Sequence, residues 1–174
     1  TDKAGEFYRK NFTAMLAYVS NRVPEITEEF YKIDDAMKAG FGWENGPFEI
    51  WDAIGVEKAI TLMEAENLKP AAWVTEMLAA GITSFYTIKD GSVYYYDIPS
   101  KSYQKVPGQD AFIILDNIRG TKTIWQNKEA EIQDLGDGIL NLEFKSKMNS
   151  IGSGVLQGIN KAIDLAEKDY KGLV

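Results

Sequence analysis

Carboxylates are the residues of this chain whose type and spacing could support catalysis. Asp34 and Asp35 are adjacent, and Glu44, Glu49 and Asp52 surround a loop rich in glycine and aromatic residues. Two carboxyl groups can serve as general acid and base when they face one another. Adjacent residues of a helix point about 100° apart, so Asp34 and Asp35 are not placed to share a proton. We expect a solvated or helix-capping role for this pair.

Glu49 follows Pro47 by two residues, and proline favours the first turn of a helix. A carboxylate in that turn interacts favourably with the positive end of the helix dipole, which indicates a structural role for Glu49. One alternative is a hydrolase that uses Asp34, Asp35, Glu44 or Glu49. It would require two carboxyl groups about 5–9 Å apart in an open cleft.

The composition excludes several kinds of chemistry. The 174 residues include no histidine and no cysteine, and the formal net charge is −7. Triads, imidazole bases, thiol nucleophiles, disulfides and thiolate metal sites are therefore excluded. The acidic balance argues against a nucleic-acid partner, and no apolar run approaches the roughly 18 residues that span a bilayer. With no N-terminal signal pattern visible, we expect a cytoplasmic protein without a membrane partner.

The aromatic residues and glycines favour structural roles. Tyr94–Tyr96 could stack on bases or sugars, but no basic residues interleave with them, so a hairpin that covers helices is favoured. We interpret Trp43, Trp51 and Trp73 as core and interface anchors. The glycines at 152–158 match neither the dinucleotide pattern GxGxxG nor the phosphate loop GxxxxGK[ST].

The spacing of apolar residues predicts five helices within the first 81 residues, joined by short loops. Prolines are expected in the first turns of the second, third and fifth helices, at Pro24, Pro47 and Pro70. Glycines are expected to end the second, third and fifth helices, at Gly40, Gly55 and Gly81.

After these helices, the spacing of apolar residues changes to one that is typical of β-strands. Residues 85–88 and 93–96 flank Asp90-Gly91, and residues 131–135 and 139–144 flank a second glycine-rich turn, so both pairs predict β-hairpins. A helical stripe follows from Val155 to Ala166.

Two stretches are less regular. Residues 112–115 could form a buried strand or a helical turn, whereas 123–125 read as extended. Residues 171–174 read as the start of a buried strand. Because a parallel strand after a crossover helix needs cover on both faces, we expect the chain to be a piece of a longer polypeptide.

The fold class expected from these elements is mainly α with β-hairpins. We expect a helical domain over residues 1–107, a partly extended linker over 108–129, and an incomplete β-β-α-β unit over 130–174. No reaction follows from the residues alone.

The first half of the chain resembles the C-terminal helical domain of 3-hydroxyacyl-CoA dehydrogenases. Residues 33–43, IDDAMKAGFGW, and residues 46–52, GPFEIWD, carry the resemblance. That family shows D-x-A-M-x-x-G-x-G followed shortly by G-P-F-x-x-x-D, and both halves occur here in order with the right spacing. The resemblance extends more loosely over residues 5–107.

The second half resembles the opening of an enoyl-CoA hydratase, or crotonase, domain. Residues 134–144 match its first hairpin and residues 147–151, KMNSI, match the short stretch that precedes its first helix. A dehydrogenase domain followed by a hydratase domain is similar to the fused β-oxidation enzymes with that order. The two resemblances together cover nearly the whole chain.

The resemblance implies a parent polypeptide that oxidises 3-hydroxyacyl-CoA with NAD and hydrates enoyl-CoA. In such enzymes the NAD-binding domain precedes the helical domain, and the hydratase catalytic groups follow the first parallel strand. The chain is therefore expected to lack both catalytic centres and to depend for NAD on a domain absent from it. We expect acyl-CoA as the parent's substrate and a homodimer as its assembly.

The resemblance also implies four substrate-binding residues. Lys147 matches a position near the CoA nucleotide, and Gly46, Pro47 and Phe48 match a turn near the interdomain cleft and dimer surface. A solvated loop lysine is the structural alternative for Lys147. The alternative function for the whole chain is a stand-alone acidic helical interaction protein without CoA chemistry.

Overall fold

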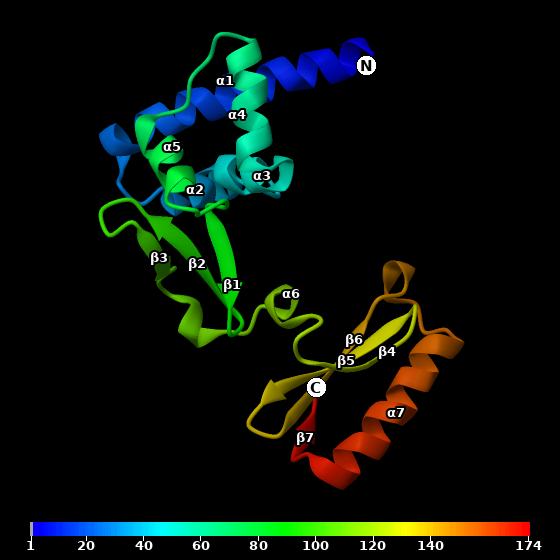
Figure 1. Cartoon of the computed structure of the whole chain (residues 1–174). Coiled ribbons are helices and arrows are strands. Elements are labelled where there is room, and N and C mark those ends of the chain that lie inside the picture. Colours follow the sequence, from blue (N-terminus) through cyan, green and yellow to red (C-terminus); the bar gives the residue numbers. More distant parts are fainter. Residues whose placement is uncertain (1) are drawn as a thin grey trace. The chain divides into compact units, whose positions relative to one another are not determined.

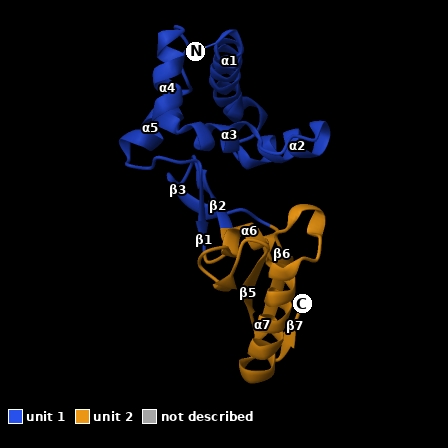
Figure 2. Ribbon diagram, turned by 90° about the vertical axis from the view of Figure 1, so that its right-hand side faces the viewer, with its two compact units in different colours: residues 1–89, 93–107 blue, residues 90–92, 108–174 orange. Residues whose placement is uncertain are grey.

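The computed structural model describes residues 2–174, which divide into two compact units (Figures 1 and 2). The described part of unit 1 comprises residues 2–89 and 93–107, and unit 2 comprises 90–92 and 108–174. Residues 108–129, for which we expect a linker, cluster with unit 2. Between residues 2 and 174, no helix combines the length and the apolar character that crossing a membrane requires.

Unit 1 contains the five helices expected from the sequence. They are α1 (Lys3–Ile26), α2 (Tyr31–Phe41), α3 (Pro47–Ile54), α4 (Val56–Ala65) and α5 (Ala72–Ala79).

The predictions for Pro24 and Gly40 were wrong. Pro24 lies in the last turn of α1 rather than at the start of the next helix. A proline cannot donate to the carbonyl one turn earlier, and that carbonyl, Ser20 O, instead accepts from Trp73 Nε1 at 3.0 Å. Likewise α2 continues past Gly40 to Phe41, and Gly42 ends it in the left-handed conformation.

A three-stranded sheet follows the helices in unit 1. The predicted hairpin is confirmed as β1 (Tyr86–Lys89) and β2 (Ser92–Asp97), and β2 pairs with β3 (Ser102–Lys105), a strand that the sequence did not predict. The side chains of Tyr95 and Tyr96 are buried in the helical core, which confirms that this hairpin covers the helices.

The centre of unit 1 is a cluster of aromatic rings. Phe48 lies 4.7 Å from Phe30 and 5.1 Å from Phe85, measured between ring centroids. Trp51 and Trp73 are buried beside them, as expected of core anchors, whereas Trp43 is only half-buried. Edge-to-face and tilted contacts of this kind stabilise a core beyond the area that they bury.

Unit 2 contains one four-stranded sheet and one long helix. Its elements are η1 (Gln109–Ala111), α6 (Leu115–Ile118), β4 (Thr123–Gln126), β5 (Ala130–Gly136), β6 (Ile139–Phe144), η2 (Lys147–Asn149), α7 (Ser153–Asp169) and β7 (Gly172–Leu173).

The order of its sheet is β4-β5-β6-β7, with β7 parallel to β6. The expected β-β-α-β succession is therefore present, and β4 adds an antiparallel strand before it. Residues 112–114 form neither a strand nor a helix, and only Leu115 begins a helical turn.

Helix α7 covers one face of this sheet. Ala162 packs against Ile132 and Leu140, which are fully buried. A Cβ atom at Gly158 would lie 2.7 Å from the Cβ of Ala130, so only glycine allows the helix this close to β5.

Candidate functional site

Residues 33–43 and 46–52 together make up the two-part pattern, and Asp34 lies in its first half. Asp34 is almost fully buried, with 1% exposed. It lies on α2, but its oxygens accept hydrogen bonds from the backbone N–H groups of Phe48 at 2.9 Å and Glu49 at 3.1 Å. Those N–H groups belong to the first turn of α3 and have no partner within that helix. Asp34 therefore caps α3 from a different helix, which confirms the capping role expected from its sequence.

Gly46 allows this cap to form. A Cβ atom at position 46 would lie 2.3 Å from the Cβ of Asp34, a distance that no side chain can accept. The N–H of Gly46 donates to Glu49 Oε2 at 2.7 Å, and Glu49 Oε1 lies 2.7 Å from Lys38 Nζ. Glu49 is thus a first-turn carboxylate with a structural role, as its position predicted.

Two further contacts join the helices to β1. The hydroxyl of Tyr86 donates to Asp34 Oδ2 at 2.8 Å. Asp52, at the end of the second half of the pattern, accepts from the backbone N–H groups of Phe85 and Tyr86, both at 2.8 Å. The two aspartates of the pattern thus hold α2, α3 and β1 together.

Burial controls the ionisation of this cluster. It raises the pKa of Asp34 to about 7, although three donors surround the carboxylate. It likewise raises the pKa of Asp52 to about 6, against the effect of its two backbone donors. Burial and the neighbouring Asp34 raise the pKa of Tyr86, so this phenol remains a proton donor.

These contacts favour structure over hydrolysis. The oxygens of Asp34 and Asp52 are occupied by donors inside the protein, and Asp35 is exposed beside Lys38 at 3.4 Å. Across residues 2–174, no group of three acidic side chains is arranged to hold a metal ion. Asp35 and Glu49, which the hydrolase alternative also names, both lie beside the ammonium group of Lys38, at 3.4 Å and 2.7 Å.

Two hollows in unit 1 share Phe12 in their lining. One, of about 250 Å³, is lined by Phe12, Trp43, Glu44, Asn45 and Ile50, and therefore adjoins the loop of the pattern. The other, of about 240 Å³, lies between α1 and the start of α4. Its lining is mostly apolar but includes two cations, Arg9 and Lys58. The lining residues are Arg9, Phe12, Thr13, Leu16, Ile54, Lys58, Ala59 and Leu62.

The sequence-predicted binding residues fall in both units. Gly46, Pro47 and Phe48 are buried at the start of α3, and Phe48 belongs to the aromatic core. Lys147 lies in the exposed turn η2 of unit 2, next to Met148, which is 91% exposed. Their substrate-binding roles remain predictions.

The sequence reasoning did not identify Lys38 and Tyr86 as parts of the site. Lys38 is one helical turn after Asp34, a spacing that places both near the start of α3. Tyr86 is separated from Asp34 by 52 residues, so no local pattern could indicate their contact.

A comparison with protein families finds a match, which lies within the first unit. Residues 9–89, which include helices α2–α5, most of α1 and strand β1, match the family model described as 3-hydroxyacyl-CoA dehydrogenase, C-terminal domain. This part of the chain is therefore similar to the C-terminal domain of 3-hydroxyacyl-CoA dehydrogenases, the family that the two-part pattern resembles.

Three curated relatives align with almost the whole chain. A Bacillus subtilis protein named "Probable 3-hydroxyacyl-CoA dehydrogenase" is 40% identical over 174 residues, which cover 99% of this chain and 22% of the relative. Proteins of Rickettsia felis and Rickettsia prowazekii, both named "Putative fatty acid oxidation complex trifunctional enzyme", are 24% and 25% identical, covering 97% of this chain and 20% of each relative. The chain thus spans about a fifth of the length of these relatives. None of the three names mentions a hydratase, so the hydratase resemblance of unit 2 stays a prediction.

Proposed function

We propose that the chain is part of a fatty-acid β-oxidation polypeptide that joins an NAD-dependent 3-hydroxyacyl-CoA dehydrogenase to an enoyl-CoA hydratase. The proposal rests on the comparisons. Residues 9–89 match the family model, and the alignments with all three relatives continue through unit 2. Unit 1 is the scaffold for the acyl-CoA cleft and the dimer surface, and unit 2 opens the hydratase domain. NAD binds to a domain outside this chain.

The scaffold role is supported by how the carboxylates are used. Asp34 and Asp52 bind backbone N–H groups and hold α2, α3 and β1 in place. A residue that caps a helix in the protein interior is unable to act on a substrate at the same time. We propose that the chain by itself carries neither the oxidation nor the hydration step.

A chimera tests this proposal most directly. The aligned segment of the Bacillus subtilis relative is replaced by the 174 residues of this chain. We expect the chimera to form NADH from 3-hydroxyacyl-CoA and NAD, whereas the purified 174-residue chain forms none and leaves enoyl-CoA unchanged. A folded chimera without activity would contradict the scaffold role, and turnover by the isolated chain would contradict the absence of catalytic centres.

The surface of α1 supports the proposed homodimer. Phe7 and Tyr8 are 62% and 59% exposed, and the ring of Tyr8 stacks on Phe12, which lines both hollows. An apolar area of this kind on a helix is typical of an interface. We propose that a second copy covers it.

Sedimentation measures this association. We expect Phe7→Glu together with Tyr8→Glu to convert a dimer into a monomer. Leu156→Glu, at an equally exposed apolar position of α7, is the control and should leave the dimer intact. A wild-type chain that sediments as a monomer at every concentration would contradict the dimer.

A further inference from the structure

Strand β4 forms an edge of the sheet in unit 2. The order β4-β5-β6-β7 places only β5 beside it, and no other strand of the described chain lies on its outer side. An edge strand presents unpaired N–H and C=O groups that can pair with an added strand. Its side chains include two apolar residues, Ile124, which is 41% exposed, and Trp125, which is half-buried.

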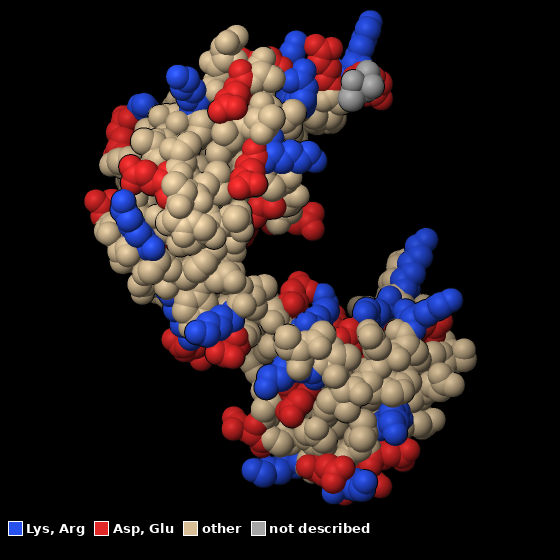
Figure 3. All heavy atoms as spheres, in the orientation of Figure 1, with Lys and Arg blue, Asp and Glu red and all other residues tan. Residues whose placement is uncertain are grey.

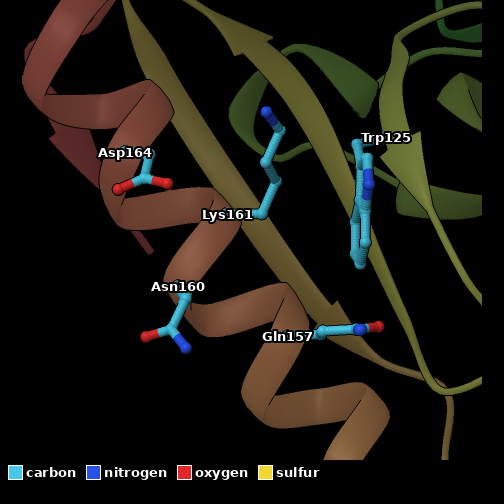
Figure 4. A pocket seen from close by; sticks show the side chains of 5 residues that line it. All are labelled: Trp125, Gln157, Asn160, Lys161 and Asp164. Atoms are coloured by element: carbon cyan, nitrogen blue, oxygen red, sulfur yellow. The ribbon is translucent and has the colours of Figure 1, made fainter.

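A hollow of about 430 Å³ lies between β4 and α7. It is lined by Trp125, Gln157, Asn160, Lys161 and Asp164. Figure 4 shows Gln157 and Lys161 on the side of α7 that faces the indole of Trp125, while Asn160 and Asp164 point away from it. The wall beside the sheet edge therefore consists of an aromatic face, an amide and an ammonium group.

Three exposed lysines surround this edge. Lys122 precedes β4, Lys128 follows it, and Lys161 lies across the hollow on α7. Within residues 2–174 none of the three forms an ion pair, although the chain carries a net charge of −7. Figure 3 shows basic and acidic groups mostly interspersed on one face of the molecule. The lysines at β4 are thus available to an acidic ligand.

We propose that the edge of β4 and the hollow beside α7 bind an extended acidic peptide, which joins the sheet as an additional strand. The backbone of the peptide pairs with β4, an apolar side chain lies on the indole of Trp125, and its carboxylates approach the three lysines. Backbone pairing gives such a site its affinity, and the side-chain pockets give it specificity. This inference is independent of the proposed dehydrogenase role, because all of its residues belong to unit 2.

A synthetic peptide that alternates glutamate with valine, with phenylalanine at its centre, is the probe. We expect it to bind the full chain in a fluorescence anisotropy titration and to slow hydrogen exchange at the amides of β4. Two control peptides, one with lysine in place of glutamate and one with N-methylated backbone amides, should not bind. Equal binding of either control would overturn the proposal.

Charge reversal on α7 provides the matched variants. Lys161→Glu should weaken binding by about fivefold, since one exposed ion pair contributes up to about 1 kcal/mol. Lys168→Glu, on the same helix but near Asp169, should leave the affinity unchanged. Trp125→Ala should weaken binding by about tenfold, and a circular dichroism spectrum shows whether that variant is folded. Unchanged affinity in a folded Lys161→Glu protein would overturn the proposal, as would self-association of the chain through β4.

Discussion

Two carboxylates, one in each unit, are buried to the same extent but have different partners. Asp34 in unit 1 is 1% exposed and accepts from two backbone N–H groups and one phenol, all of them neutral donors. Glu131 in unit 2 is 2% exposed, accepts from the hydroxyl of Thr123, and lies 2.9 Å from the ammonium of Lys145.

The pKa values of these two carboxylates shift in opposite directions. Burial raises the pKa of Asp34 to about 7, and its three neutral donors do not offset that cost. Burial also opposes the charge of Glu131, yet hydrogen bonds from Thr123 and Lys145 together lower its pKa below the ordinary value. Glu131 thus keeps its charge with the help of a hydroxyl and an ammonium group, whereas burial outweighs the three neutral donors of Asp34.

The largest expected effect is the dependence of unit 1 stability on pH. The folded-state pKa of Asp34, about 7, exceeds its ordinary value of 3.8, so the folded protein binds more protons between these values. Stability from Asp34 is therefore greatest below about pH 4 and falls as pH rises to 7, by a total on the order of 4 kcal/mol.

Urea unfolding followed at a series of pH values measures this fall. Asp34→Asn should remove the part of the slope that Asp34 contributes, and Asp35→Asn, at the exposed neighbouring position, should leave it unchanged. A wild-type slope equal to that of Asp34→Asn would contradict the shift.

Removal of the cap should have the next largest effect. Asp34→Ala leaves the N–H groups of Phe48 and Glu49 and the hydroxyl of Tyr86 without their acceptor. We expect a loss of about 3 kcal/mol in the free energy of unfolding of unit 1, since each buried donor without a partner costs about 1–3 kcal/mol. Thermal unfolding at pH 5 measures it, with Asp35→Ala as the control that should remain near wild type.

Gly46→Ala should destabilise the same cap without removing an acceptor. The added Cβ would overlap Asp34 and force α2 and α3 apart, at a cost of about 2–3 kcal/mol. Gly40→Ala is a matched control, because nothing lies within 4 Å of a Cβ at that position. Equal stabilities of the two variants in denaturant unfolding would show that the close approach is unimportant.

Unit 2 should respond to the loss of its cation. Lys145→Met leaves Glu131 buried without a positive partner, and we expect unit 2 to lose about 2 kcal/mol at neutral pH because Lys145 is itself partly exposed. Since the pKa of Glu131 is lowered in the folded protein, its contribution is present above pH 4.5 and is lost as pH falls below that value. Hydrogen exchange at the amides of β5 distinguishes this change from effects on unit 1.

The smallest expected effect concerns a second long-range cap. Glu129 accepts from the N–H of Gly154 in the first turn of α7 at 2.9 Å, as Asp34 does for α3, but its side chain is only half-buried. Glu129→Ala should therefore cost about 1 kcal/mol, less than Asp34→Ala. Chemical denaturation of both variants under the same conditions checks this order, and a larger loss for Glu129→Ala would reverse the comparison.

The sequence predicted the features that depend on local patterns. Asp90-Gly91 identified the first hairpin, the spacing of apolar residues identified helix α7, and Pro47 identified the start of α3. The sequence placed Pro24 at the start of a helix, because prolines favour the first turn. In the structure Pro24 lies near the end of α1, where it leaves the carbonyl of Ser20 without a backbone donor. Trp73, 53 residues after Ser20, donates to that carbonyl instead.

The contacts of the candidate site also join residues that are far apart in the sequence. The residues around Asp34 indicated a resemblance to a family and a helix-capping role. They did not indicate which helix Asp34 caps, because its contact with the first turn of α3 depends on how α2 and α3 pack. The pairing of β4 with β5 depends on a bulge between Thr123 and Trp125, which no alternation of residue types indicates. Bulges are common in edge strands, and edge strands are often short. Their pairing partners are therefore hard to predict from the sequence.

The contact between Ser20 and Trp73 has a consequence for the order of events during synthesis. Ser20 O accepts from the indole, and Ser20 Oγ accepts from the N–H of Ala71 at 3.0 Å. While the polypeptide emerges from the ribosome, the final turn of α1 lacks these partners until Ala71 and Trp73, 51 and 53 residues after Ser20, have been added. The first helix to be made is consequently completed only when α5 is being made.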